Sequence, residues 1–189
     1  MNQQETLRIL NKVGAVITDS HIVYTSGKHG SVYINKDAVY PHTAETSRLC
    51  REIAERFADD NVQTVIAPAI GGAILSHLTA HHLSEIYDRQ VFGVYAEEPK
   101  FYDKLPENKD CLLIKRGYDR FITGKNVLVV EDILTTGETA KKVVEATRRA
   151  GGNIVGLGAL CNRGGVTSQD VADVPKLISL LELSLESWS

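Results

Sequence analysis

The sequence has few cysteines and no long apolar run. Its three cysteines, Cys50, Cys111 and Cys161, are odd in number and widely spaced, and no CxxC pair occurs, which argues against a disulfide scaffold or a zinc ribbon. No stretch approaches the roughly 18 consecutive apolar residues of a membrane-spanning helix. The opening MNQQETLRIL lacks the basic-then-apolar order of a signal peptide. We therefore expect a reduced, cytoplasmic protein with no membrane partner.

The sequence also lacks a strong excess of either charge. It contains 21 Lys and Arg against 24 Asp and Glu, which gives a net charge of −3. A chain with this balance has no general electrostatic attraction to nucleic acids or anionic membranes. We therefore expect no nucleic-acid partner, and any anion must be bound at a local site.

Apolar runs and helical patterns alternate along the chain. The expected strands are 62–67, 91–95, 112–114, 127–130 and 154–160, and the expected helices are 43–59, 71–84, 137–150 and a short one ending near residue 14. The strand candidates are continuously apolar, which is typical of strands buried on both faces. The sequence therefore predicts an α/β protein with a mostly parallel central sheet flanked by helices.

The stretch VLVVEDILTTGET, residues 127–139, places Glu131 and Asp132 directly after four apolar residues. In parallel sheets, ligands bind at the carboxyl ends of the strands. Two adjacent carboxylates repel each other and need hydroxyl donors, a cation or water, so ribose hydroxyls or magnesium would suit them. The residues TTGET then offer hydroxyls and free amides at a helix N-terminus, which bind phosphate. The stretch predicts a ribose-5-phosphate site, with an ordinary threonine N-cap as the alternative.

A second strand end carries APAIGG, residues 67–72. Gly71 and Gly72 let backbone amides approach an anion closely, although glycines here could instead let a helix pack against the sheet. Beside the first motif, this stretch predicts a second anion pocket. The ligand would then carry phosphate at both ends of a ribose. The Walker A and GxGxxG motifs are both missing from the sequence.

The stretch EEPKFYDKLPENKDC, residues 97–111, contains two prolines, many charges and little apolar content. A loop of this length in an α/β domain is typically a lid or a binding loop. A surface hairpin without a function is the alternative.

On these residues the chain resembles the type I phosphoribosyltransferases, and within them the orotate-specific branch. The resemblance runs from about residue 7 to residue 183. VLVVEDILTTGET resembles the signature that binds phosphoribosyl diphosphate (PRPP), and APAIGG resembles the pyrophosphate loop. SGKHGSVYIN resembles the segment that begins the orotate pocket. LLIKRG and LCNRGG resemble the orotate branch more than the purine-salvage enzymes.

The resemblance implies a type I phosphoribosyltransferase fold in a single domain, residues 1–189. Residues 1–40 would form a small N-terminal hood that contributes to base binding, and residues 97–111 would form a mobile lid loop. The family is usually homodimeric, with the lid reaching the neighbouring subunit, so we expect a homodimer.

The implied activity is that of a glycosyltransferase that transfers a pentosyl group. It would join PRPP to orotate and give orotidine 5′-phosphate and pyrophosphate in de novo UMP biosynthesis. Mg²⁺ would be the cofactor, bound mainly through PRPP. The alternatives are a phosphoribosyltransferase for another base, or a PRPP-sensing regulator without catalysis.

Position by position, the resemblance implies three groups of site residues. PRPP would be bound by Glu131, Asp132, Ile133, Leu134, Thr135, Thr136, Gly137, Glu138, Thr139, Ala69, Ile70, Gly71 and Gly72. Orotate would be bound by Thr135, Arg163, Tyr33 and Ile34. Catalysis would depend on Lys100, Lys104 and Asp132, with the lysines facing the departing pyrophosphate.

The sequence departs from the family pattern at basic positions. Thr25 and Gly71 stand where many or some members carry lysine, and Glu97 and Glu98 stand where arginine or lysine is common. Lys100 and Lys104 are therefore expected to supply the missing charge, with Lys28, Lys115 and Arg116 next in line.

Overall fold

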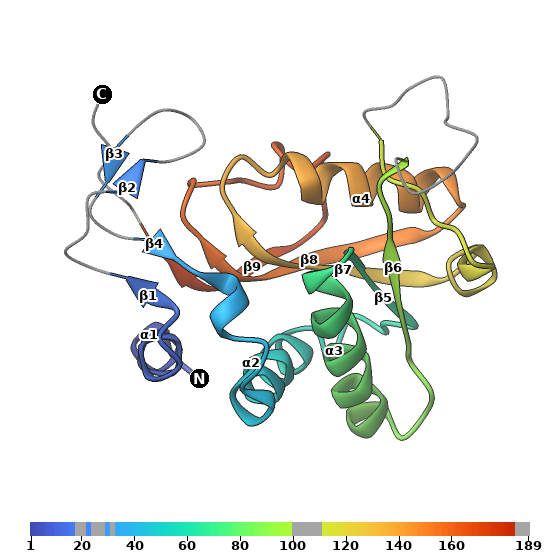
Figure 1. Cartoon of the computed structure of the whole chain (residues 1–189). Coiled ribbons are helices and arrows are strands. Elements are labelled where there is room, and N and C mark those ends of the chain that lie inside the picture. The colour runs from blue at the N-terminus through green and yellow to red at the C-terminus, as the bar shows by residue number, and fades with distance from the viewer. Residues whose placement is uncertain (18–21, 24–28, 31–32, 100–110, 184–189) are drawn as a thin grey trace.

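The fold is built on a parallel five-stranded sheet with the strand order β6-β5-β7-β8-β9 (Figure 1). The computed structural model describes residues 1–17, 22–23, 29–30, 33–99 and 111–183. The strands of the sheet are β5 (Thr64–Pro68), β6 (Phe92–Ala96), β7 (Asn126–Leu134), β8 (Asn153–Asn162) and β9 (Leu177–Glu182). Every neighbouring pair in it is parallel.

Helices cover both faces of this sheet (Figure 1). They are α1 (Gln3–Lys12), α2 (Thr43–Arg56), α3 (Gly71–Tyr87) and α4 (Glu138–Arg149). One face packs against α2 and α3, and the other packs against α4. Successive residues of β7 divide between two cores, with Leu128 and Val130 in the first and Val127 and Val129 in the second. Burial on both faces explains why the strand sequence is continuously apolar.

Two small antiparallel pairs lie outside the main sheet, in the N-terminal part of the chain. β1 (Val16–Ile17) pairs with β4 (Tyr33–Ile34), and β2 (Ile22–Val23) pairs with β3 (His29–Gly30). A short 3₁₀ helix (Lys36–Ala38) then leads toward α2. The expected hood at residues 1–40 falls on these elements, and its role in base binding stays a prediction.

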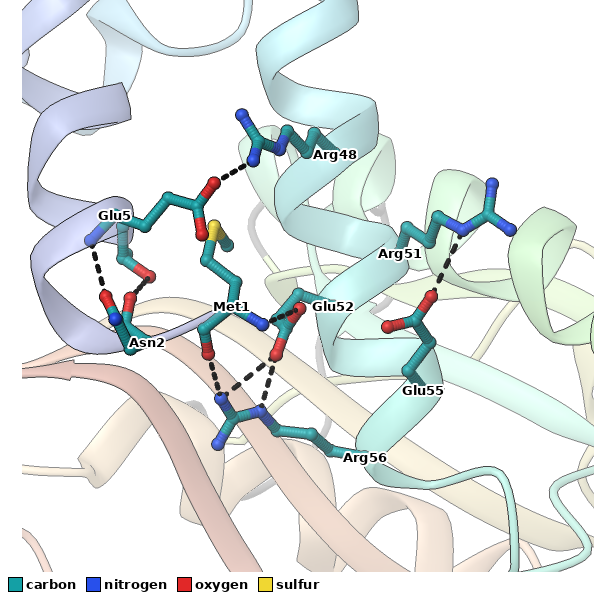
Figure 2. A network of polar contacts seen from close by, with 9 residues as sticks. Met1, Asn2, Glu5, Arg48, Arg51, Glu52, Glu55 and Arg56 are labelled. Atoms are coloured by element: carbon teal, nitrogen blue, oxygen red, sulfur yellow. Dashed lines mark hydrogen bonds and ion pairs between the residues drawn. The ribbon is translucent and has the colours of Figure 1, made fainter.

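A polar network joins the N-terminal segment to α2 (Figure 2). The amino group of Met1 lies 2.7 Å from Glu52 Oε2, and Arg56 Nη2 donates to the Met1 carbonyl at 2.9 Å. Glu5 on α1 forms an ion pair with Arg48 on α2. Such contacts fix the position of α1 beside α2, at the edge of the molecule where β9 lies.

The prediction of an α/β fold with a mostly parallel sheet flanked by helices is confirmed, with three differences. Residues 112–114 form no strand, because Leu113 makes only an isolated bridge to Glu97. The expected strand 127–130 extends to Leu134, because β8 pairs with it along that whole length. Strand β9 was not expected, because its leucine-rich sequence does not distinguish a strand from a helix. Within the described part of the chain, no helix is long and apolar enough to cross a membrane.

Candidate active site

The site lies where β5 and β7 separate. These strands pair from Thr64–Val127 to Ile66–Val129, after which β7 continues beside β8 alone. Glu131 and Asp132 therefore lie inside β7, beyond its last pair with β5. The expectation that they follow the strand end is wrong in detail, but they still lie in the carboxyl half of the strand, which is the ligand-binding end of such sheets.

Two adjoining cavities share Glu131, Ile133 and Thr139. The first, of about 150 Å³, joins the loop after β5 to both acids and is lined by Lys36, Pro68, Ala69, Ile70, Gly71, Gly72, Glu131, Asp132, Ile133 and Thr139. The second, of about 120 Å³, follows the loop after β7 and is lined by Glu131, Ile133, Leu134, Thr135, Thr136, Gly137, Glu138, Thr139 and Ala140. The acid pair thus lies between the two loops that the sequence singled out.

The second cavity opens on the N-terminus of α4. Gly137 is the N-cap residue, with a φ of 79°, and it has no side chain to cap the helix, while the Glu138 amide donates to Thr136 Oγ1 at 3.4 Å. A Cβ at position 137 would lie 2.9 Å from Val171 and 3.0 Å from Val166, so glycine is required both by conformation and by space. The first-turn amides of α4 have no partners within the helix, and they can bind an anion. The alternative of a threonine N-cap is wrong for this helix.

Asp132 is held by two residues from the N-terminal side of the chain. Its Oδ2 accepts a hydrogen bond from the Tyr40 hydroxyl at 2.8 Å and lies 3.0 Å from Lys36 Nζ. Its Oδ1 accepts from the amide of Ile133 at 2.7 Å. Burial, and next the negative charge of Asp132, raise the pKa of Tyr40 well above its ordinary value. The carboxylate therefore already has a cation and a hydroxyl donor in place.

Glu131 is buried like Asp132 but has fewer hydrogen-bond partners. Its Oε1 accepts from the Asp132 amide at 3.1 Å, while its buried Oε2 has no hydrogen-bond partner among the described residues. Burial, and next the charge of Asp132, raise the pKa of Glu131 to about 8. A buried polar oxygen without a partner is costly, so this atom indicates a place for a ligand hydroxyl or a cation.

Arg163, Thr135 and Tyr33 come together beside the second cavity. Arg163 Nε donates to Thr135 Oγ1 at 3.0 Å, and its guanidinium carbon lies 5.8 Å from the centre of the Tyr33 ring. The loop after β8 lies directly on the loop after β7, since a Cβ on Gly164 would meet the Thr135 carbonyl oxygen at 1.6 Å. Glycine at 164 is therefore what allows Arg163 to reach Thr135. Ile34 is 2% exposed and packs into the core.

The predicted catalytic lysines, Lys100 and Lys104, lie outside the described residues, as does Lys28. Arg116 forms a two-pronged ion pair with Glu97, with Nη2 at 2.7 Å from Oε1 and Nε at 3.1 Å from Oε2. It is thus engaged at the base of the 97–111 loop.

The sequence reasoning missed Lys36 and Tyr40. Their four-residue spacing is visible in NKDAVY, but nothing in that spacing says that both would meet Asp132, which is 92 residues from Tyr40.

A parallel sheet with a buried acid pair between two loops that follow its strands defines a class of α/β protein whose ligand site lies at the carboxyl ends of the strands. The phosphoribosyl transferase domain family matches residues 36–186. The chain is 37% identical over 163 residues to the orotate phosphoribosyltransferase of Pelotomaculum thermopropionicum, which covers 86% of this chain and 77% of that protein. The chain therefore belongs to the phosphoribosyltransferase family, and within it to the orotate phosphoribosyltransferases.

Solved structures have the same fold. The orotate phosphoribosyltransferase of Mycobacterium tuberculosis H37Rv in complex with Fe(III) dicitrate superposes with a TM-score of 0.73 at 20% identity, covering 96% of both chains. The same protein in complex with PRPP gives a TM-score of 0.66 at 18% identity, also covering 96% of both chains. The predicted family and its fold are confirmed.

Proposed function

We propose that the protein transfers the phosphoribosyl group of PRPP to orotate, giving orotidine 5′-phosphate and pyrophosphate in de novo UMP biosynthesis. The observation that carries this proposal is the buried acid pair between two anion-binding loops, with Arg163 and Thr135 beside it. The identity of 37% to a protein of this name supports the choice of orotate.

PRPP lies along the two cavities in this proposal. Its 5-phosphate binds residues 135–139, where the amides and dipole of α4 favour an anion. Its ribose hydroxyls donate to Glu131 and Asp132, and its diphosphate lies against residues 69–72. The order of these groups along PRPP matches the order of the loops around the acid pair.

Orotate binds beside Arg163. A guanidinium recognises a carboxylate through two parallel hydrogen bonds, and Thr135 fixes the orientation of this guanidinium through Nε. Tyr33 lies near the same group. Among nucleobases, a carboxylate is the feature that distinguishes orotate from uracil and the purines, so Arg163 is the specificity-determining residue of this proposal.

In the reaction, the bond between ribose C1 and the diphosphate oxygen breaks, and its electron pair leaves with pyrophosphate. The ring nitrogen of orotate releases its proton, which passes to the departing pyrophosphate or to water, and forms the new bond to C1 through a transition state with oxocarbenium character. The protein contributes by aligning the two substrates and by excluding water from the ribosyl cation. Asp132, already held by Tyr40, keeps the ribose in the orientation that exposes C1.

In this proposal, the Glu131 carboxylate is the protein group that would hold Mg²⁺. Hard cations prefer carboxylate and phosphate oxygens, and the buried Oε2 of Glu131 has no hydrogen-bond partner in the described part of the chain. PRPP itself carries most of the ligands. When bound, the ion offsets negative charge on the diphosphate.

The protein acts as a homodimer in the cytoplasm in this proposal. Ile74 on α3 and Phe92 on the edge strand β6 are 40% and 36% exposed, and an apolar cavity of about 520 Å³ on this side is lined in part by Ile74, Tyr95 and Tyr118. A second copy would cover this surface. Sedimentation equilibrium tests the homodimer, since an Ile74→Glu variant should shift the protein toward monomer.

The three free cysteines are in keeping with a reducing compartment such as the cytoplasm.

The test of the activity is the loss of orotate absorbance when protein, PRPP, orotate and Mg²⁺ are mixed. Omission of Mg²⁺ should stop the loss, and adenine, hypoxanthine and uracil should be poor replacements for orotate. Equal or better turnover of a purine would indicate a transferase for another base. PRPP binding without turnover of any base would indicate a regulator.

A further inference from the structure

The cavity beside residues 69–72 poses a charge problem. The diphosphate of PRPP carries several negative charges, and the same cavity contains Glu131 and Asp132. The loop itself consists of Ala69, Ile70, Gly71 and Gly72, none of which has a charged side chain. Of the described residues that line this cavity, Lys36 alone is cationic. Its placement therefore decides whether the described part of the cavity can hold an anion.

Lys36 reaches into this cavity from its half-exposed position. It starts the short 3₁₀ helix after β4, and its side chain is 46% exposed although its Nζ lies 3.0 Å from Asp132 Oδ2. An ammonium group has three donors on a flexible stem. Burial acts to lower the pKa of Lys36, but the charge and hydrogen bond of Asp132 outweigh it, so that the pKa is raised. The side chain remains a cation whichever anion it contacts.

Tyr40 explains why the loop has no side chain of its own at position 71. A Cβ built on Gly71 would lie 2.9 Å from both Cε2 and the hydroxyl of Tyr40. The Tyr40 ring therefore occupies the space into which a side chain at 71 would extend, including the lysine found there in some family members. The same hydroxyl donates to Asp132 at 2.8 Å. Residues 36–40 thus provide both the group that fills this space and the cation beside it.

We propose that Lys36 binds the diphosphate of PRPP and the pyrophosphate product, exchanging its contact with Asp132 for phosphate oxygens when PRPP enters. Ribose hydroxyls then take its place on Asp132, while Tyr40 continues to hold that carboxylate. Lys36 stays protonated throughout, and it stabilises the electron pair that leaves with the diphosphate oxygen. This inference rests on the proposed function.

The test compares three variants by calorimetry, with two ligands that divide PRPP between them. Mg²⁺-pyrophosphate probes the leaving-group side, and orotidine 5′-phosphate probes the ribose and base side. Lys36→Gln should weaken pyrophosphate binding by about 10- to 150-fold, the scale of a lost charged hydrogen bond, and change orotidine 5′-phosphate binding less than about threefold. Lys36→Arg should keep most of the pyrophosphate affinity.

Tyr40→Phe is the matched control, because it removes the hydroxyl that donates to Asp132 and leaves the charge of Lys36. It should weaken orotidine 5′-phosphate binding and leave pyrophosphate binding nearly unchanged. Thermal melting of each variant checks that the fold is intact.

Two results would overturn the inference. Wild-type pyrophosphate affinity in Lys36→Gln would show that Lys36 does not contact the diphosphate. Equal weakening of both ligands in that variant would show that Lys36 only positions Asp132. Failure of the proposed function is distinct from both, because the wild-type protein itself would then not consume orotate in the presence of PRPP and Mg²⁺, whatever Lys36→Gln does to pyrophosphate binding.

Discussion

The two loops that we propose to bind the phosphates of PRPP obtain their binding groups in different ways. Residues 135–139 carry theirs within one strand–loop–helix unit, as threonine hydroxyls and the first-turn amides of α4. Residues 69–72 carry no charged side chain, and Ile70 is 80% exposed. Among the described residues, the cation that lines the same cavity, Lys36, and the ring beside Gly71, Tyr40, come from a segment about 30 residues earlier in the chain.

This difference separates a local site from an assembled one. Position along the chain fixes the geometry of a local site, because strand, loop and helix N-terminus follow one another without interruption. An assembled site depends on tertiary packing, so its charge can be supplied by any segment that reaches it. Binding of the diphosphate leaving group should therefore depend on distant residues more strongly than binding of the 5-phosphate does.

The largest expected effect is on turnover, through the assembled site that binds the diphosphate. A Lys100→Ala, Lys104→Ala double variant should lose about 100- to 1000-fold in turnover, because charge aligned with a developing anion contributes on the order of 3–4 kcal/mol. Orotidine 5′-phosphate, which lacks pyrophosphate, should bind almost normally. Lys141→Ala on α4 is the control, and steady-state kinetics is the measurement. Near-normal turnover of the double variant would leave Lys36 as the main cation for the leaving group.

The acid pair between the loops comes next. Asp132→Asn should weaken PRPP binding by about 10- to 150-fold, since charged hydrogen bonds contribute roughly 1.5–3 kcal/mol. Glu131→Gln should cost less at pH 7, because burial and then the charge of Asp132 raise the pKa of Glu131 to about 8 and the glutamine resembles its protonated form. Calorimetric titration with PRPP measures both. Unchanged affinity in both variants would show that these acids do not bind the ribose.

Much of the fold and part of the site could be predicted from the sequence, because both depend on apolar strands that are visible in it. Strands buried on both faces are continuously apolar, so the core of β5 and of β7 was visible in the sequence. The acid pair and TTGET follow one of those runs directly. The end of β7 was misplaced because charged residues usually end a buried strand, whereas here β8 continues to pair with it through Leu134 and Asn162.

The sequence could not predict which distant segments of the chain contact each other at the site. Lys36 and Tyr40 lie in a short stretch, NKDAVY, whose residue types do not indicate a site, and their contacts with Asp132 arise only in the folded chain. Similarly, LCNRGG indicated an arginine near the base, but the need for glycine at 164 comes from the Thr135 carbonyl that it contacts. Such contacts become visible only when the two segments are placed together.

A smaller effect is expected for the base pocket. Arg163→Lys should raise the Michaelis constant for orotate about tenfold, because lysine keeps the charge but loses one of two parallel hydrogen bonds. The Michaelis constant for PRPP should change much less. Steady-state kinetics with each substrate varied in turn separates the two. If only the PRPP constant moved, Arg163 would belong to the other side of the site.

Gly137→Ala tests the local loop. Gly137 and Gly124 have similar φ values of 79° and 69°, but a Cβ at 137 would meet Val171 and Val166 while a Cβ at 124 would meet nothing within 4 Å. Both variants should lose about 1 kcal/mol of stability from the positive φ, with a further loss in Gly137→Ala. Urea unfolding measures this. Only Gly137→Ala should also weaken ribose-5-phosphate binding, and equal effects in the two variants would contradict a role of this loop.

A separate effect, on stability rather than on ligand binding, is expected in the ligand-free protein as the pH changes. Burial, and then the charge of Asp132, raise the pKa of Glu131 from its ordinary 4.5 to about 8. Between these values the unfolded chain has released this proton while the folded protein keeps it. Raising the pH from about 5 to about 8 therefore lowers the unfolding free energy, by at most about 1.4 kcal/mol per pH unit for one proton, and the effect levels off above pH 8.

Glu131→Gln isolates this contribution, because it leaves every other titrating group in place. The difference in unfolding free energy between the variant and the wild type should grow in favour of the variant as the pH rises from 5 to 8. Urea unfolding at several pH values, without PRPP or Mg²⁺, measures that difference. A constant difference across this range would mean that Glu131 is ionised in the folded protein. Its partnerless Oε2 would then have to be stabilised by a group that the described residues do not provide.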